Sequence, residues 1–241
     1  MKSMDIKKRI LTMTAIVAVV LVAAPARMGA QELSVGGDLV SSYVWRGAYC
    51  GGVSVQPALS FSAGGFSLAA WGSVGFISPA YVDEFDFTLG YGIGGLSLAI
   101  TDYWFAYRGD EEWAPDYFNY KSEETAHMFE ATVGYDFGPL ALSWNTFFAG
   151  ADFKASDAEK RAFSTYIEAS APFKVGDYGL KLELGVTPWE SIYADKFNVV
   201  NLGITGSKEI KITESFTLPA FSKVIFNPAA KQTYFVFGIS L

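Results

Sequence analysis

Residues 66–76, FSLAAWGSVGF, give the plainest indication of how this chain folds. Alternate residues of the stretch form two series with different character: Phe66, Leu68, Ala70, Gly72, Val74 and Phe76 against Ser67, Ala69, Trp71, Ser73 and Gly75. A period of two places successive side chains on opposite faces of a strand. In the next segment Phe85 and Phe87 alternate with Glu84 and Asp86, so the second face must meet water.

Alternating segments recur along the chain and predict an all-β fold. They span residues 33–46, 53–63, 66–77, 81–93, 96–107, 127–137, 140–150, 161–173, 178–188, 196–206, 211–226 and 232–241. The pattern fits either a soluble sandwich with its apolar face inward or a transmembrane barrel with its apolar face in lipid. The content of 16% aromatic residues, together with the features of the turns and chain ends below, favours the barrel.

The connections between these segments alternate between tight and long. The tight ones contain Gly64 and Gly65, Gly94 and Gly95, Gly138 and Pro139, residues 174–177, and residues 207–210. Glycine supplies the positive φ that hairpin turns require. The longer ones are chiefly 108–126, 151–160 and 189–196. Short periplasmic turns and longer extracellular loops are typical of a transmembrane antiparallel up-and-down β-barrel, here with about 12 strands.

Residues 1–30 have the features of a cleavable signal peptide. A basic start precedes an apolar run at residues 10–24, and this run is shorter than the about 20 residues that a membrane-spanning helix needs. We expect cleavage after Ala30, with Ala26 as the alternative, and one barrel domain at residues 31–241 in the outer membrane of a Gram-negative bacterium. The last strand, residues 233–241, resembles the terminal signal that barrel-assembly machinery recognises.

Composition limits the partners of the predicted barrel. Without residues 1–30 the chain holds 13 basic and 24 acidic residues, which argues against a nucleic-acid partner. Cys50 is the single cysteine, so the chain cannot carry a disulfide framework. We expect outer-membrane lipid and small hydrophilic solutes as partners, and no cofactor or metal.

Three short motifs resemble the TorF family of porin-like proteins. They are SSYVWRG at residues 41–47, QPAL at residues 56–59, and EFD at residues 84–86 ahead of Gly90 and Tyr91. Ser42 stands where the family more commonly has an aspartate. The resemblance covers residues 1–107 and implies a porin-like role, for substrates that are poorly defined in the family itself.

Charged residues on the water-facing parity predict a lumen that prefers cations. They are Asp38, Arg46, Glu84, Asp86, Glu130, Asp136, Glu168, Lys181, Glu183 and Lys223. We expect a channel for passive diffusion whose lining includes a subset of these: Arg46, Glu84, Asp86, Glu130, Glu168, Lys181 and Glu183. The alternative is a closed barrel in which Arg46 pairs with Glu84 or Asp86 as a plug.

The long loop at residues 108–126 is acidic and aromatic. Its candidate ligand-binding residues are Trp113, Asp116, Tyr117 and Tyr120, which would serve a closed barrel with a structural or surface-binding role. The competing interpretation is that this segment is an ordinary solvated surface loop that binds no ligand. The single histidine, His127, is predicted to be a rim residue. A twelve-stranded outer-membrane phospholipase needs a serine two residues after its histidine, and Phe129 stands there, so we predict no enzyme and rank a lipid-modifying activity last.

Some residues conflict with a regular ladder or could serve two roles. Pro219 removes a backbone donor and Asp102 falls on the apolar parity, so either a bulge near one of them restores the register or the expected strand bounds are wrong. Aromatic residues near the outer strand ends predict a girdle at the membrane interface. The alternative is a row of aromatic side chains in the lumen along which sugars or nucleosides pass. These residues are Trp45, Trp104, Trp144, Tyr103, Tyr107 and Tyr193.

Overall fold

The computed structural model describes residues 31–76, 81–108, 116–122 and 124–241, and the predicted signal peptide lies outside these residues. All regular elements in the described part are β-strands: β1 (Glu32–Val40), β2 (Tyr43–Trp45), β3 (Ala48–Gly51), β4 (Ser54–Ala63), β5 (Phe66–Gly75), β6 (Tyr81–Ile93), β7 (Leu96–Arg108), β8 (His127–Asp136), β9 (Ala141–Gly150), β10 (Thr165–Val175), β11 (Tyr178–Thr187), β12 (Asn198–Lys211), β13 (Thr217–Asn227) and β14 (Gln232–Ser240). No helix among the described residues is long and apolar enough to cross a membrane.

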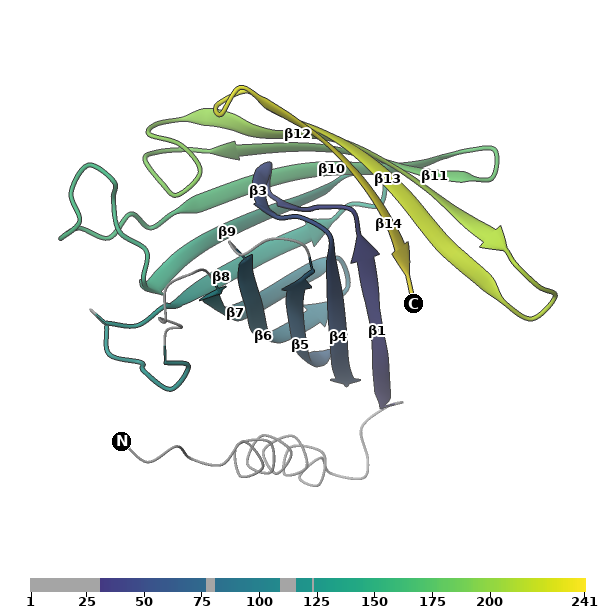
Figure 1. Cartoon of the computed structure of the whole chain (residues 1–241), viewed down its shortest axis with the longest axis horizontal. Helices are drawn as coiled ribbons and strands as arrows, with labels where there is room; N and C mark the ends of the chain where they lie inside the picture. Colours follow the sequence, from purple (N-terminus) through teal and green to yellow (C-terminus); the bar gives the residue numbers. More distant parts are fainter. Residues whose placement is uncertain (1–30, 77–80, 109–115, 123) are drawn as a thin grey trace.

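Twelve strands close into one antiparallel up-and-down barrel, which confirms the predicted fold. Strands that follow one another in the chain are neighbours, except that β1 pairs with β4 because β2 and β3 form a separate hairpin. The barrel closes where β14 pairs with β1, with Asp38 opposite Ser240 and Val40 opposite Gly238. Figure 1 shows the C-terminal end of β14 beside β1. A closed sheet has no free edge, which hydrocarbon would leave without hydrogen-bond partners.

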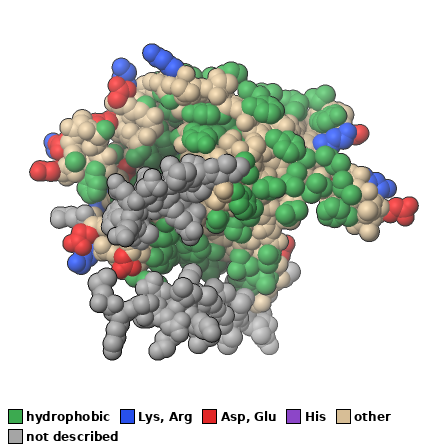
Figure 2. Space-filling model, viewed as in Figure 1, with side chains coloured by type: hydrophobic (Ala, Val, Ile, Leu, Met, Phe, Trp, Pro, Cys, Tyr) green, Lys and Arg blue, Asp and Glu red, His purple; other side chains and the backbone are tan. Residues whose placement is uncertain are grey.

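The outer wall of the barrel is apolar. Residues that face each other across an antiparallel ladder share a face of the sheet, and outward rows such as Phe85 opposite Trp104 continue around the wall. Large side chains exposed on this wall include Leu89, Ile100, Val133, Leu182 and Phe235. Figure 2 shows hydrophobic side chains across the middle of the visible face, with charged side chains gathered toward its two ends.

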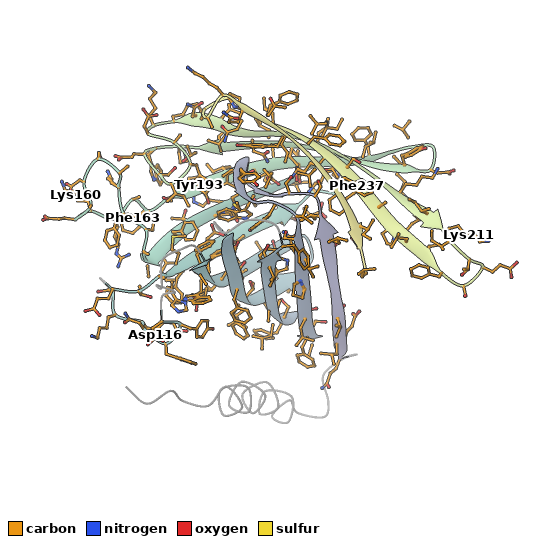
Figure 3. All side chains as sticks on the ribbon, in the orientation of Figure 1. Asp116, Lys160, Phe163, Tyr193, Lys211 and Phe237 are labelled. Atoms are coloured by element: carbon orange, nitrogen blue, oxygen red, sulfur yellow. The ribbon has the colours of Figure 1, made fainter. Side chains whose placement is uncertain are left out.

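The two ends of the barrel carry different connections. The turn end carries the tight turns, and Gly64, Gly94, Gly138 and Gly176 adopt positive φ there. The loop end carries the connections at residues 41–53, 151–164 and 188–197, and the described part of 109–126. In Figure 3 the loop end lies on the side of Lys160 and the turn end on the side of Lys211.

The predicted position of one tight turn differs from the structure. β12 runs on to Lys211 and connects to β13 through residues 212–216, so the predicted turn at 207–210 is wrong. No bulge forms at Pro219, which pairs with Glu209 in an unbroken ladder. β14 pairs with β13 only from Ala220 onward, so Pro219 has a strand on one side only. A residue without an N–H is tolerated at such an edge.

The predicted first strand, 33–46, ends too late. β1 stops at Val40, and the chain then folds back as the β2–β3 hairpin. The turn of this hairpin is formed by Arg46 and Gly47, with φ values of 49° and 80°. Leu39, Tyr43 and Trp45 keep the same parity, so the apolar alternation continues across the break and does not reveal it.

Asp102 is accommodated without the predicted bulge. The ladders of β7 run without a shift past this residue, which lies opposite Phe87 on β6 and Phe129 on β8. Asp102 therefore faces outward. Its carboxylate lies 2.7 Å from Nδ1 of His127, the first residue of β8. A polar partner on the neighbouring strand offsets the outward charge.

Candidate functional site

The connection at residues 41–53, here called the lumen hairpin, folds into the barrel at the loop end. The ring of Tyr43 lies 5.6 Å from that of Trp71 on β5. The ring of Trp45 lies 5.5 Å from that of Tyr103 on β7 and 5.9 Å from that of Tyr193 in the connection 188–197. The side chains of this hairpin therefore contact several strands of the wall from inside the lumen.

Arg46 fixes the tip of the lumen hairpin. Its Nη2 donates to Oε1 of Glu130 over 2.8 Å, and its Nη1 donates to Oε2 of the same carboxylate and to the Tyr193 hydroxyl. The guanidinium also lies 4.8 Å from the centre of the Tyr166 ring. The Arg46 side chain is 11% exposed and that of Glu130 is 1% exposed. Two parallel charge-assisted hydrogen bonds of this kind are among the stronger contacts in proteins.

Gly47 lets the hairpin tip approach β12 and β13. A Cβ atom at this position would lie 1.9 Å from the backbone oxygen of Val200, closer than any side chain can come. Asn227 donates from Nδ2 to the Gly47 carbonyl oxygen over 2.9 Å. Gly47 therefore supplies both the positive φ of the turn and the close contact with the wall.

Glu84 and Asp86 lie beside the hairpin without the predicted pairing to Arg46, whose partner is Glu130 instead. They are 4% and 8% exposed, and both oxygens of Glu84 and Oδ1 of Asp86 have no hydrogen-bond partner within the described part of the chain. Burial, followed by the negative charge of Glu84, raises the pKa of the Tyr43 hydroxyl and raises that of the Cys50 thiol to about 12. The acidic pair therefore faces hairpin side chains that keep their protons.

The lumen toward the turn end holds a second group of charges. Glu183 lies between two cations, with Lys181 Nζ and Lys223 Nζ each 2.6 Å from one of its oxygens. Glu168 accepts a hydrogen bond from the Tyr166 hydroxyl over 2.6 Å. An open cavity of about 440 Å³ is lined in part by Glu168. The predicted lining residues thus lie on the lumen face of the barrel or, for Arg46, on the lumen hairpin.

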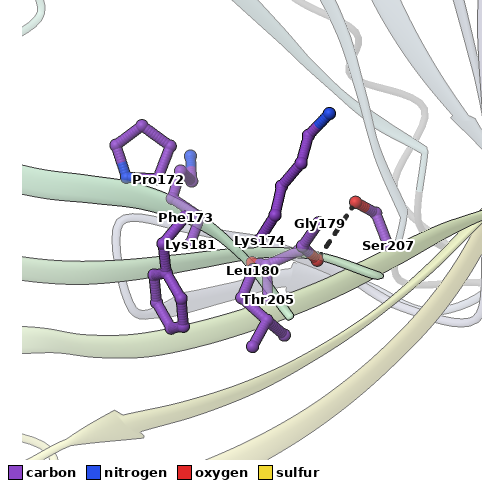
Figure 4. A pocket seen from close by; sticks show the side chains of 8 residues that line it. All are labelled: Pro172, Phe173, Lys174, Gly179, Leu180, Lys181, Thr205 and Ser207. Atoms are coloured by element: carbon purple, nitrogen blue, oxygen red, sulfur yellow. Dashed lines mark hydrogen bonds between the residues drawn. The ribbon is translucent and has the colours of Figure 1, made fainter. Parts of the chain in front are cut away.

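Another cavity of about 400 Å³ lies beside Lys181. Figure 4 shows Lys174 and Lys181 on one side of the sheet, with Phe173 and Leu180 directed to the other. Ser207 donates to the backbone oxygen of Gly179 over 3.3 Å at its edge. The cavity places lysine side chains near the turn end of the lumen.

The described part of the predicted ligand-binding loop lies against the outer wall rather than over the lumen. Trp113 is outside the described residues. The Tyr117 ring packs on Phe85 and Trp104, with ring centres 5.9 and 5.4 Å apart, and Tyr120 stacks on His127 at 4.3 Å.

Asp116 makes a local contact within the same loop. Its side chain accepts a hydrogen bond from the backbone N–H of Phe118 over 3.0 Å. The rings of Tyr117 and Tyr120 lie 6.5 Å apart, and a ligand-binding role for this loop stays a prediction.

His127 is the first residue of β8 at the loop end, the position predicted for a rim residue, and this loop covers it. It is 0% exposed. Its Nδ1 contacts Asp102 and its Nε2 contacts the Tyr117 backbone oxygen, each over 2.7 Å. Neither ring nitrogen is free to act as a base, and the absence of enzymatic activity stays a prediction. Among the described residues, no group of three or more His, Cys, Asp or Glu side chains is arranged to hold a metal ion.

The predicted aromatic girdle is wrong for three of its six members, and the side chain of Tyr107 lies outside the described part of the structure. Trp104 and Trp144 face outward, opposite outward residues of their neighbouring strands. Trp45, Tyr103 and Tyr193 instead surround Arg46 inside the lumen. A position near a strand end does not tell whether a side chain faces outward or into the lumen. Strand parity also gives no information about residues in connections that fold inward.

Several buried lumen residues were not predicted to belong to the site. The Tyr166 hydroxyl joins Glu168 to Asn201, whose Nδ2 donates to it over 3.0 Å. Lumen-facing parity was the one signal that could have identified them. No protein-family model matches the chain, and no curated protein sequence is significantly similar to it.

Proposed function

We propose that this protein is an outer-membrane channel through which small hydrophilic solutes diffuse passively, with a preference for cations and with the lumen hairpin as its constriction. The closed barrel and its apolar outer wall fit an outer-membrane protein. In that setting the turn end faces the periplasm and the loop end faces the outside. The TorF-like motifs and the predicted recognition of β14 by assembly machinery are part of the same proposal.

The lumen charges support the cation preference. Seven acids and three bases occupy the lumen-facing positions named above. Arg46 binds Glu130 while Lys181 and Lys223 bind Glu183, so two of those acids engage the three bases named there. Lys174 adds a fourth base on the same face as Lys181 near the turn end. The remaining acids carry no described basic partner, and an excess of acidic over basic side chains along a lumen favours cations.

The observation that carries the proposal is the lumen hairpin itself. A twelve-strand barrel is wider than the eight-strand barrels that side chains fill and narrower than the sixteen-strand barrels with broad channels. Here a backbone segment, held by Arg46 and Glu130, narrows the lumen near the outside. Cavities lined by Glu168 and by Lys181 remain toward the periplasm.

A closed barrel is the second candidate. Phe147, Val200 and Ile225 are buried on the lumen face, where they fill space at the level of the hairpin. A barrel filled in this way would display its loops or serve a structural role without conducting.

Planar-bilayer recording separates these two functions. We expect discrete conductance steps and a reversal potential that indicates cation preference in a KCl gradient. Glu84→Gln/Asp86→Asn should move the reversal potential toward zero. The control variant Asp116→Asn/Glu124→Gln removes the same charge from exposed loop positions and should leave it unchanged. A folded protein that is silent where a known porin conducts would refute the channel and favour the closed barrel.

A further inference from the structure

An open cavity of about 870 Å³ lies on the outer wall near the loop end, away from the lumen. Its lining combines aromatic, basic and small side chains: Trp144, Thr146, Lys154, Lys160, Arg161, Ala162, Phe163 and Trp189. Trp144 lies opposite Val133 on β8 and Ile167 on β10, both on the outward face. The cavity therefore opens to whatever surrounds the barrel.

The floor of this cavity is aromatic. The rings of Trp144 and Trp189 lie 6.5 Å apart, and Trp189 Nε1 donates to the Phe163 backbone oxygen over 3.0 Å. Phe163 has a φ of 48°, which is costly for a residue with a side chain. It is 48% exposed nevertheless, so the strained backbone presents the ring outward. In lipid such a floor would contact an acyl chain.

The rim of the cavity is basic, although the chain as a whole is acidic. Lys154, Lys160 and Arg161 line it, and no acidic residue does. Asp157 lies 2.7 Å from Lys160 Nζ, and Asp157 and Glu190 also lie near Lys154, so these two acids offset part of the positive charge of the rim. Arg161 donates from Nη1 to the Gly150 carbonyl oxygen over 2.8 Å and lies over the Phe153 ring at 5.4 Å, and its other N–H groups have no hydrogen-bond partner among the described residues. Figure 3 shows Lys160 and Phe163 at the same end of the barrel.

Hydrogen bonds between the connections 151–164 and 188–197 hold this rim in place. Ser156 donates from its backbone N–H and its hydroxyl to the Glu190 carboxylate, over 2.8 and 2.7 Å. The Ile192 N–H donates to the Ser164 hydroxyl over 2.9 Å, and that hydroxyl donates to Asp152. A rim that is already ordered loses little freedom when it binds a ligand.

We propose that this cavity binds a phosphate-bearing lipid of the outer leaflet, with its headgroup against the basic rim and an acyl chain on the aromatic floor. The inference rests on the proposed outer-membrane location and not on conduction. Charge-assisted hydrogen bonds from lysine and arginine suit phosphate oxygens. An apolar floor beside a basic rim selects a molecule that is both anionic and apolar.

Native mass spectrometry of the folded full-length protein in nonionic detergent tests this site. The probes are dioctanoyl phosphatidic acid, dioctanoyl phosphatidylcholine and inorganic phosphate. Lys154→Gln/Lys160→Gln should weaken phosphatidic acid binding about tenfold, as expected for lost charged hydrogen bonds. The control variant Lys121→Gln/Lys208→Gln removes two positive charges outside the cavity and should leave phosphatidic acid binding unchanged. Trp144→Ala should weaken lipid binding while folding, judged by heat-modifiable migration, is retained.

Three outcomes would overturn the inference: phosphatidylcholine binding as tightly as phosphatidic acid, equal affinity in the two lysine variants, or full competition by inorganic phosphate at the same concentration. The proposed channel is judged separately by conductance. A conducting protein that binds no phosphatidic acid would reject this site alone. A silent protein that binds it through Lys154 and Lys160 would reject the channel alone.

Discussion

Replacing Glu130 with glutamine should release the lumen hairpin. Arg46 and Glu130 are both buried, and the two guanidinium nitrogens bind the two carboxylate oxygens. Removing one member of a buried ion pair typically costs about 3–5 kcal/mol, because the remaining charge is left uncompensated. Glutamine can still accept one hydrogen bond, so we expect the lower end of this range. At about 1.4 kcal/mol per factor of ten, the released population should rise about a hundredfold.

Cys50 reports this release without any engineered label. It is the single cysteine of the chain and lies on the lumen hairpin. Burial raises the pKa of its thiol to about 12, so the reactive thiolate is scarce while the hairpin is seated. Modification by a membrane-impermeant maleimide should be slow in the wild type and much faster in Glu130→Gln. Glu183→Gln, which changes another lumen carboxylate, is the control. Equal rates in all three proteins would refute the proposed clamp.

Further substitutions test individual contacts. Gly47→Ala should also speed Cys50 modification, because a Cβ would lie 1.9 Å from the Val200 oxygen, whereas Gly94→Ala, also at positive φ but with nothing nearby, should not. Tyr193→Phe removes one hydrogen bond of 2.6 Å to Arg46. At about 1 kcal/mol it should raise the rate about fivefold, and an effect as large as that of Glu130→Gln would contradict the assigned roles. His127→Ala removes two contacts of 2.7 Å, so trypsin should cut after Lys121 faster in the folded barrel; an unchanged rate would show that His127 does not hold the loop.

The barrel could be predicted because a closed wall with an apolar outer face and a more polar inner face imposes a period of two on its strands. Twelve alternating segments therefore gave the strand number, and glycines at tight turns gave the order of the connections. The errors have two causes. The apolar alternation can continue past the true end of a strand, and strand pairing can continue past the expected position of a turn. Tyr43 and Trp45 keep the parity of β1 after it ends, and residues 207–210 stay paired beyond the expected turn.

The candidate site was less accessible to sequence reasoning. Parity placed Glu84, Glu130 and Glu168 on the lumen face, but it says nothing about which carboxylate an inward-folded connection reaches. The pairing of Arg46 with Glu130 joins residues 84 positions apart and depends on the path of the hairpin. The contact of Asp102 with His127 was hidden for a related reason, since two polar residues on an apolar face resemble errors of register until their neighbouring strands are known.

Single-channel conductance of a protein without its lumen hairpin tests whether this hairpin forms the constriction of the channel. Residues 43–51 would be replaced by a glycine-serine linker of equal length, which keeps the connection between β1 and β4 and removes Arg46 from the lumen. We predict conductance steps several times larger than those of the wild type, with cation preference retained by Glu84 and Asp86. Steps of unchanged size, or continued silence from a folded barrel, would show that the hairpin is not the constriction.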